Sequence, residues 1–142
     1  MTHRKVGVTQ KYINEITYEV IGCAIEVHKH LGPVLLESVY EKCFRKELTL
    51  RSLEYQTQQW VPIEYKGLLL EAELRLDIIV EDLLLVELKA IESILPIHEA
   101  QVLTYMRLMQ KPKGILINFN CVNIYKEGQK TFVNELFANL PK

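Results

Sequence analysis

The sequence predicts an α/β domain in which helices pack on a mixed β-sheet, with the element order α-α-β-β-β-α-β-β-α. The N-terminal third carries the three-to-four-residue apolar spacing of helices. The middle of the chain alternates apolar and polar residues, as half-buried strands do. An apolar run at 113–119 follows a helical segment, which favours a parallel crossover. The 142 residues suffice for one domain, residues 1–142, with a full hydrophobic core.

Two helices are predicted at the start. The first covers residues 14–31, and Gly32 and Pro33 end it because glycine allows a left-handed turn and proline cannot continue the helix. Its apolar positions are Ile16, Val20, Ala24 and Val27. The second helix covers residues 35–52. Its apolar face consists of Leu36, Val39, Tyr40, Cys43, Phe44 and Leu48.

Three strands are predicted next, at 56–64, 72–80 and 83–90, with a hairpin turn at 65–67. In the second strand the alternation places one set of residues on each face. The two sets are Ala72, Leu74, Leu76, Ile78 and Val80, and Glu73, Arg75, Asp77 and Ile79. In the third strand Leu85, Glu87 and Lys89 share a face. If the two strands pair, Asp77 can lie on that same face.

The C-terminal part is expected to supply four more elements. Pro96 opens a helix that runs to about residue 110, and a buried strand follows at 113–119. A further strand is predicted at 122–125, and a closing helix at 133–140.

Composition limits the functional classes. There is no run of about 18 uncharged apolar residues and no apolar signal core after the N-terminus, so we expect no membrane association. Three widely spaced cysteines suggest buried thiols in a reducing, cytoplasmic location. The formal net charge of −1 argues against a tight, non-specific nucleic-acid binder. It allows an enzyme that brings its own metal.

Charged residues in apolar strands need a reason, because an unpaired buried charge is costly. Asp77 and Glu87 could both bind Mg²⁺ or Mn²⁺ through their carboxylates, with the carbonyl of Leu88 as a third oxygen ligand. Lys89 could then orient a water molecule and offset phosphate charge. The alternative is two solvated carboxylates with a surface ion pair, since Glu-x-Lys is common in proteins.

Polar residues on the helix 96–110 support the first interpretation. Gln101 and Tyr105 are four residues apart and His98 is three before Gln101, so the three share a helical face. Such a row suits substrate contacts or support of metal ligands, or it is a helix edge that faces water. Glu37, in the first turn of the second helix, either interacts with the helix dipole or adds an acid to the site.

The stretch 31–41, Leu-Gly-Pro-Val-Leu-Leu-Glu-Ser-Val-Tyr-Glu, resembles the signature of the GxxExxY protein family, which is placed in the PD-(D/E)XK nuclease superfamily. The similarity continues through 75–77, 86–90, 96–101, 103–105 and 116–120, and covers about residues 14–125. It implies a restriction-endonuclease-like core with catalysis at Asp77, Glu87 and Lys89. It also implies assistance from Glu37, and a Gln-x-x-x-Tyr motif at Gln101 and Tyr105. The family's first glycine is replaced by Val34.

The sequence therefore predicts a Mg²⁺-dependent nuclease that acts on nucleic acid; we expect the substrate to be DNA, although the residues alone do not distinguish DNA from RNA. A non-catalytic binding or assembly module with the same fold is the main alternative, favoured by the near-neutral charge and the short loops. A hydrolase of small phosphates is a third. The sequence leaves open whether the chain forms a homo-oligomer.

Overall fold

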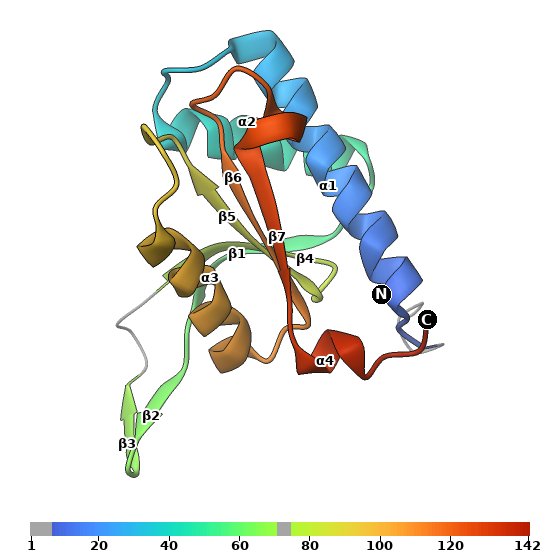
Figure 1. The fold of residues 1–142 in the computed structure, drawn as a ribbon, viewed down its shortest axis with the longest axis vertical. Coiled ribbons are helices and arrows are strands. Elements are labelled where there is room, and N and C mark those ends of the chain that lie inside the picture. The colour runs from blue at the N-terminus through green and yellow to red at the C-terminus, as the bar shows by residue number, and fades with distance from the viewer. Residues whose placement is uncertain (1–6, 71–74) are drawn as a thin grey trace.

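The computed structural model describes residues 7–70 and 75–142 and has three layers (Figure 1). Helices α1 (Gln10–Leu31) and α2 (Glu37–Leu50) cover one face of a five-stranded sheet, and α3 (Pro96–Met109) covers the other. The predicted mixed α/β class is confirmed. No helix in the described ranges is both long enough and apolar enough to cross a membrane.

The five-stranded sheet has the order β1-β4-β5-β6-β7. Its strands are β1 (Tyr55–Trp60), β4 (Arg75–Val80), β5 (Leu84–Lys89), β6 (Lys113–Asn118) and β7 (Gln129–Val133). Strands β5 and β6 are parallel, as the crossover through α3 predicts, and the other neighbours are antiparallel. Both central strands are apolar on both faces because helices cover both faces.

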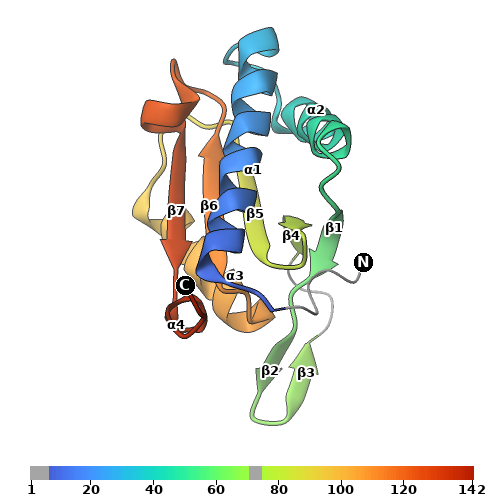
Figure 2. The same cartoon turned by 90° about the vertical axis from the view of Figure 1, so that its right-hand side faces the viewer.

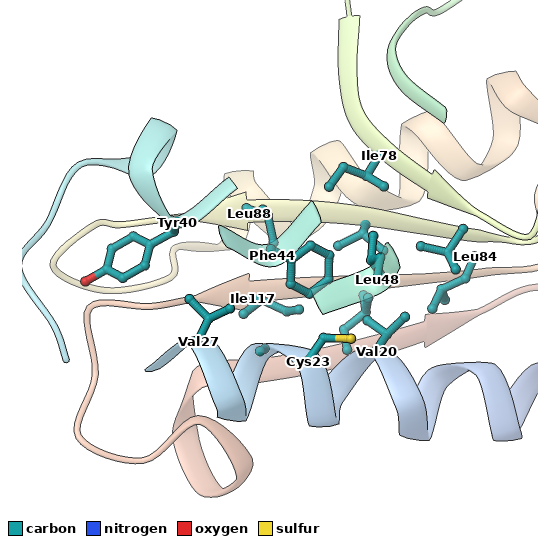
Figure 3. Close-up of a cluster of buried hydrophobic side chains, with 14 of the residues drawn as sticks. Val20, Cys23, Val27, Tyr40, Phe44, Leu48, Ile78, Leu84, Leu88 and Ile117 are labelled. Atoms are coloured by element: carbon teal, nitrogen blue, oxygen red, sulfur yellow. The ribbon is translucent and has the colours of Figure 1, made fainter. Parts of the chain in front are cut away.

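The larger core lies between the sheet and helices α1 and α2 (Figure 3). Phe44 and Leu48 of α2 and Val20 and Cys23 of α1 are fully buried there. The ring of Tyr40 stacks on that of Phe119, which follows β6, with 4.5 Å between the ring centroids. This packing fixes the N-terminal end of α2 over the carboxyl ends of β5 and β6.

The predicted strand 56–64 is two strands. Strand β1 ends at Trp60, Val61 is buried against α3, and Pro62 has no N–H to continue a ladder. Strands β2 (Ile63–Tyr65) and β3 (Leu68–Leu70) then form a separate hairpin that extends away from the body of the protein (Figure 2). The predicted turn lies in this hairpin. Residues 72–74 of the next predicted strand lie outside the described residues.

The predicted strand 122–125 is wrong. Glu127 accepts hydrogen bonds from the backbone N–H groups of Val122 and Asn123, at 2.9 and 3.1 Å. Asn123 in turn accepts from the N–H of Lys126, and the chain forms a π-helical turn, η2 (Ile124–Gly128). Local side-chain acceptors thus outcompete strand pairing here. The last strand, β7, comes after this turn.

Helix ends also differ from the prediction. Helix α1 begins at Gln10 because the side chain of Thr9 accepts a hydrogen bond from the N–H of Tyr12. The closing helix, α4 (Glu135–Ala138), is a single turn that Asn134 caps in the same way. Among the cysteines, Cys23 is buried, whereas Cys43 and Cys121 are half-buried.

The loop between α1 and α2 contains a residue in an unfavourable backbone conformation. Gly32 and Val34 have φ angles of 71° and 69°. Glycine adopts such angles without cost, but a β-branched residue is strained there. The side chain of Val34 is 80% exposed, so little packing offsets the strain.

We therefore expect Val34→Gly to stabilise the protein by roughly 0.5–1 kcal/mol, because relief of the strain outweighs the greater chain entropy of glycine. Urea unfolding would measure the change. Val122→Gly is the control, because Val122 is similarly exposed but lies outside the left-handed region, and this variant should be destabilised. A Val34→Gly protein no more stable than the parent would show that the strain is not significant.

Candidate active site

The site is centred where β4 and β5 part. Their backbone ladder pairs Val80 with Leu84 and ends at the pair Ile78 and Val86. Beyond this pair, side chains replace the ladder. The N–H of Leu88 donates to Oδ2 of Asp77 at 2.9 Å, and the N–H of Asp77 donates to Oε2 of Glu87 at 3.2 Å. Each strand thus contributes one carboxylate that binds the backbone of the other.

The same point interrupts the alternation of β4. Leu76 and Ile79 both pack on the α3 side of the sheet, whereas Ile78 packs on the opposite side. The prediction that Leu76 and Ile78 share a face is therefore wrong. On the neighbouring strand, Gln58 lies between the residues that pair with Leu76 and Ile78, and its φ is 55°. The irregularity spans both strands and turns Asp77 towards Glu87.

Both carboxyl groups are shifted towards the protonated form. Burial, and after it the charge of Asp77, raises the pKa of Glu87 to about 8. Burial also raises the pKa of Asp77, and the hydrogen bond from Leu88 opposes this effect. Asp77 and Glu87 lie where β4 and β5 part, in a poorly solvated space that we call the gap. Two carboxylates held together there repel one another, and a cation would relieve that repulsion.

Lys89 extends from the end of β5 towards α3. Its Nζ donates to Oε1 of Gln101 at 3.5 Å, and Nε2 of Gln101 donates to the hydroxyl of Tyr105 at 3.0 Å. The structure thus connects three of the predicted residues in one chain of hydrogen bonds. Burial, and then the charge of Glu87, raises the pKa of Tyr105, so its hydroxyl is kept neutral.

His98 does not join this chain of hydrogen bonds. Its Nδ1 accepts a hydrogen bond from the N–H of Leu95 at 2.9 Å, which caps the start of α3. Pro96 occupies the first turn, where a missing N–H costs nothing. The structure therefore places His98 at the helix N-terminus, where it holds the end of α3 that carries Gln101.

Glu37 lies at the start of α2, near the opposite side of the gap. Burial raises its pKa, the charge of Asp77 raises it further, and Lys89 lowers it. Glu41, one turn later, shows a pKa raised by burial and by Asp77, and forms an ion pair with Arg45 at 3.9 Å. The sequence does not single out Glu41, although its four-residue spacing from Glu37 places both on one face of α2.

Tyr40 orients this end of α2. Its hydroxyl donates to the carbonyl of Gly32 and accepts from the N–H of Leu35 at 3.1 Å. In Figure 3 this hydroxyl points away from the buried cluster that the ring joins. The side chain therefore connects the core to the loop that precedes Glu37, which is more than the core role expected from the sequence.

The donor chemistry fits a hard divalent cation. Within the described ranges, the second oxygen of each of Asp77 and Glu87 has no hydrogen-bond partner, so both remain available as ligands. Residues 7–70 and 75–142 contain no group of three or more His, Cys, Asp or Glu side chains placed to hold a metal. Mg²⁺ commonly binds through one or two carboxylates and keeps several waters, so a two-carboxylate site is sufficient.

Asn118, which the sequence did not single out, fixes the strand end beside Lys89. It is buried, and its amide accepts from the N–H and donates to the carbonyl of Ile91, both at 3.0 Å. The N–H of Phe119 donates to the carbonyl of Lys89 at 2.9 Å. These bonds hold the chain rigidly as it leaves β5.

One of three comparisons with known proteins, the match to a family model, agrees with this architecture. Residues 14–132 match the PD-(D/E)XK nuclease superfamily. A search of curated proteins found no match. One similar solved structure is described as "Crystal structure of SSO0001"; it is 18% identical, with 84% of this chain and 78% of that chain covered and a TM-score of 0.41.

The raised pKa of Glu87 makes stability depend on pH. Between the unfolded value of 4.5 and the folded value of about 8, the unfolded chain loses a proton that the folded protein keeps, so stability falls as the pH rises. Glu87→Gln keeps an acceptor for the N–H of Asp77 without the charge. We expect this variant to be more stable than the parent by roughly 1–3 kcal/mol at pH 8.

Urea unfolding in the presence of a chelator, at several values between pH 5 and 8, would measure this difference. The difference in free energy of unfolding between variant and parent should increase as the pH rises. Glu64→Gln, which removes one exposed charge from the β2–β3 hairpin, is the matched control. Parallel pH profiles for parent and Glu87→Gln would contradict the assignment of a buried, repelled carboxyl.

Proposed function

Because this chain belongs to the PD-(D/E)XK nuclease superfamily, we propose that it is a metal-dependent nuclease that hydrolyses phosphodiester bonds of DNA. The observation that carries the proposal is the exchange of hydrogen bonds between the carboxylates and backbones of Asp77 and Glu87–Leu88. Lys89 lies directly beside this pair. A structural ion pair would bring a carboxylate and a cation into contact, whereas here two carboxyl groups, the buried Glu87 and the half-buried Asp77, lie together.

Asp77, Glu87 and the carbonyl of Leu88 would hold Mg²⁺ or Mn²⁺. When bound, such an ion polarises the phosphate and stabilises charge that develops on its oxygens. The protein's part is to fix the ligands, and the hydrogen bonds to backbone N–H groups do so without flexible side-chain partners.

Lys89 would act on the substrate side of the ligands. In hydrolysis the water oxygen forms a bond to phosphorus, the bond to the leaving oxygen breaks, and the departing strand end takes up a proton. The ammonium group of Lys89, held by Gln101, offsets the negative charge that accumulates on the phosphate and orients the attacking water. Glu37 would bind a water molecule on the α2 side of the gap.

Within the superfamily we assign the chain to the GxxExxY proteins. The family signature places Tyr40 three residues after Glu37. The hydroxyl of Tyr40 binds the loop that precedes Glu37, so this spacing lets the tyrosine position the glutamate. Val34, in the place of the family's glycine, has the positive φ that glycine adopts readily. The backbone at this position therefore keeps a conformation suited to glycine.

We predict that Asp77→Ala, Glu87→Ala and Lys89→Ala each lower the rate of Mn²⁺-dependent DNA cleavage by about 10²–10⁴-fold. The losses should not add, because the three groups act as one unit. Linear, circular and single-stranded DNA and RNA should be tested in parallel, with Lys29→Ala at the exposed end of α1 as the control. Cleavage by the triple variant at the parental rate would refute the site.

Calorimetric titration with Mn²⁺ separates the enzyme from a non-catalytic module. Saturable binding that needs Asp77 and Glu87 supports the nuclease. If the parent binds no metal and cleaves none of the substrates, the binding-module alternative replaces the proposal. Cleavage of small phosphodiesters but of no polymer would indicate a small-phosphate hydrolase.

We predict a different result for Gln101→Ala and Tyr105→Phe. Both change groups that support Lys89 and lie beyond the proposed ligands. Each should lower kcat/KM for cleavage by about tenfold while Mn²⁺ affinity stays within twofold of the parent. A loss of metal affinity as large as that of Asp77→Ala would make these residues supports of the metal ligands instead.

A further inference from the structure

A hollow of about 560 Å³ opens at the carboxyl ends of the parallel strands β5 and β6. It is lined by the β5–α3 loop, the end of β6 and the loop that follows β6, including Glu92, Ser93, Ile94, Asn118, Asn120 and Val122. Its volume lies within the range of small-ligand sites, and the carboxyl ends of parallel strands are where open α/β sheets bind ligands. Nothing in the mechanism above uses it.

The hollow adjoins the proposed catalytic centre. Lys89 and Asn118 are paired neighbours on parallel strands, which lie about 4.8 Å apart. Leu85 of β5 and Leu116 of β6 both pack against α3. Side chains two residues apart on a strand lie on the same face, so Glu87, Lys89 and Asn118 are also on the α3 side of the sheet. Asn118 and Asn120 both bind the backbone of Ile91, so the wall of the hollow nearest Lys89 is rigid. A group in the hollow would therefore be held in a fixed place relative to Lys89.

The lining suits a flat, uncharged group with hydrogen-bond donors. Among its lining residues there is no lysine or arginine, so a phosphate would find no counter-charge. The side chains of Glu92 and Ser93 are exposed and, within the described ranges, make no hydrogen bond, so they are free to contact a ligand. Pro33, Ile94 and Val122 supply apolar surface. Glu127 is already used by two backbone N–H groups.

We propose that this hollow seats the base of a nucleotide next to the scissile phosphate, an inference that rests on the proposed nuclease function. The apolar side chains would contact the face of the base, and the Glu92 carboxylate would accept from an exocyclic amino group of cytosine, adenine or guanine. A paired and stacked base cannot enter such a hollow. The site therefore selects DNA that is unpaired beside the cleaved bond, in single strands or frayed ends.

Equilibrium binding of fluorescein-labelled DNA, followed by anisotropy, tests this independently of cleavage. The probes are single-stranded oligo-dC, single-stranded oligo-dT and a duplex, with Ca²⁺ present and intactness of each probe checked on a gel. The parent should bind oligo-dC about tenfold more tightly than the duplex. It should bind oligo-dC a fewfold more tightly than oligo-dT, because thymine has no exocyclic amino group.

Ser93→Trp fills the hollow and should weaken binding of oligo-dC by about tenfold, with little effect on the duplex. Thr131→Trp adds the same bulk on exposed β7 and is the matched control. Glu92→Ala should abolish the preference for oligo-dC over oligo-dT. This variant adds no bulk, so it tests the site even if Ser93→Trp perturbs the loop. Both changes lie at exposed positions, so urea unfolding should give parental stability.

Equal binding of single strand and duplex, together with no effect of Ser93→Trp, would overturn the proposal. So would tight single-strand binding that both variants leave unchanged, because the base would then lie elsewhere. These results are separable from failure of the nuclease itself, which Mn²⁺ titration and the Lys89→Ala protein detect. A chain that cleaves duplex DNA but fails these binding tests keeps its proposed function and loses the base site.

Discussion

The central constraint in this structure is the need to satisfy two backbone N–H groups where β4 and β5 part. A buried N–H group without a partner costs about as much as a lost hydrogen bond, so a ladder that ends inside a protein requires substitutes. Asp77 and Glu87 are those substitutes, each bound to the opposite strand. The same bonds that close the sheet therefore hold two carboxylates at fixed positions, so the structural role of these side chains and their proposed role as metal ligands depend on the same contacts.

The surrounding layers keep this gap in place from both sides. Helix α2 is held at its N-terminal end by Tyr40, whose ring packs on Phe119 and whose hydroxyl binds the preceding loop. Helix α3 is held at its N-terminal end by His98. The apolar layers thus bring two helix N-terminal regions to the same edge of the sheet, one carrying Glu37 and the other Gln101. Rigid elements of this kind place polar groups more accurately than loops do.

Apolar periodicity was sufficient to predict the long helices, the central strands and the parallel crossover, because burial on both faces dominates their energetics. It could not predict the change of face between Leu76 and Ile78, which depends on where the ladder to β5 stops. It also failed at 122–125, where Glu127 and Asn123 satisfy the backbone locally. The nearness of Asp77 to Glu87 followed from strand pairing, but their bonds to backbone N–H groups did not. The sequence does not indicate that Glu41 lies near Asp77, because most glutamates on helices are simply exposed to solvent.

The charge of the chain limits how the proposed nuclease could bind DNA. The gap is surrounded by Glu37, Glu41, Asp77 and Glu87, and the pKa values of all four are raised by burial. Two basic side chains lie near these groups. Arg45 forms an ion pair with Glu41, whereas the described contact of Lys89 is with the uncharged Gln101. With a formal net charge of −1, the chain has no general basic surplus from which counterion release could supply affinity for DNA. Under the proposed nuclease function, attraction for a phosphate would then come from a cation in the gap, and the remaining affinity from contacts to sugar and base. The hollow beside Asn118, which has apolar walls and the free side chain of Glu92, is where we propose such contacts.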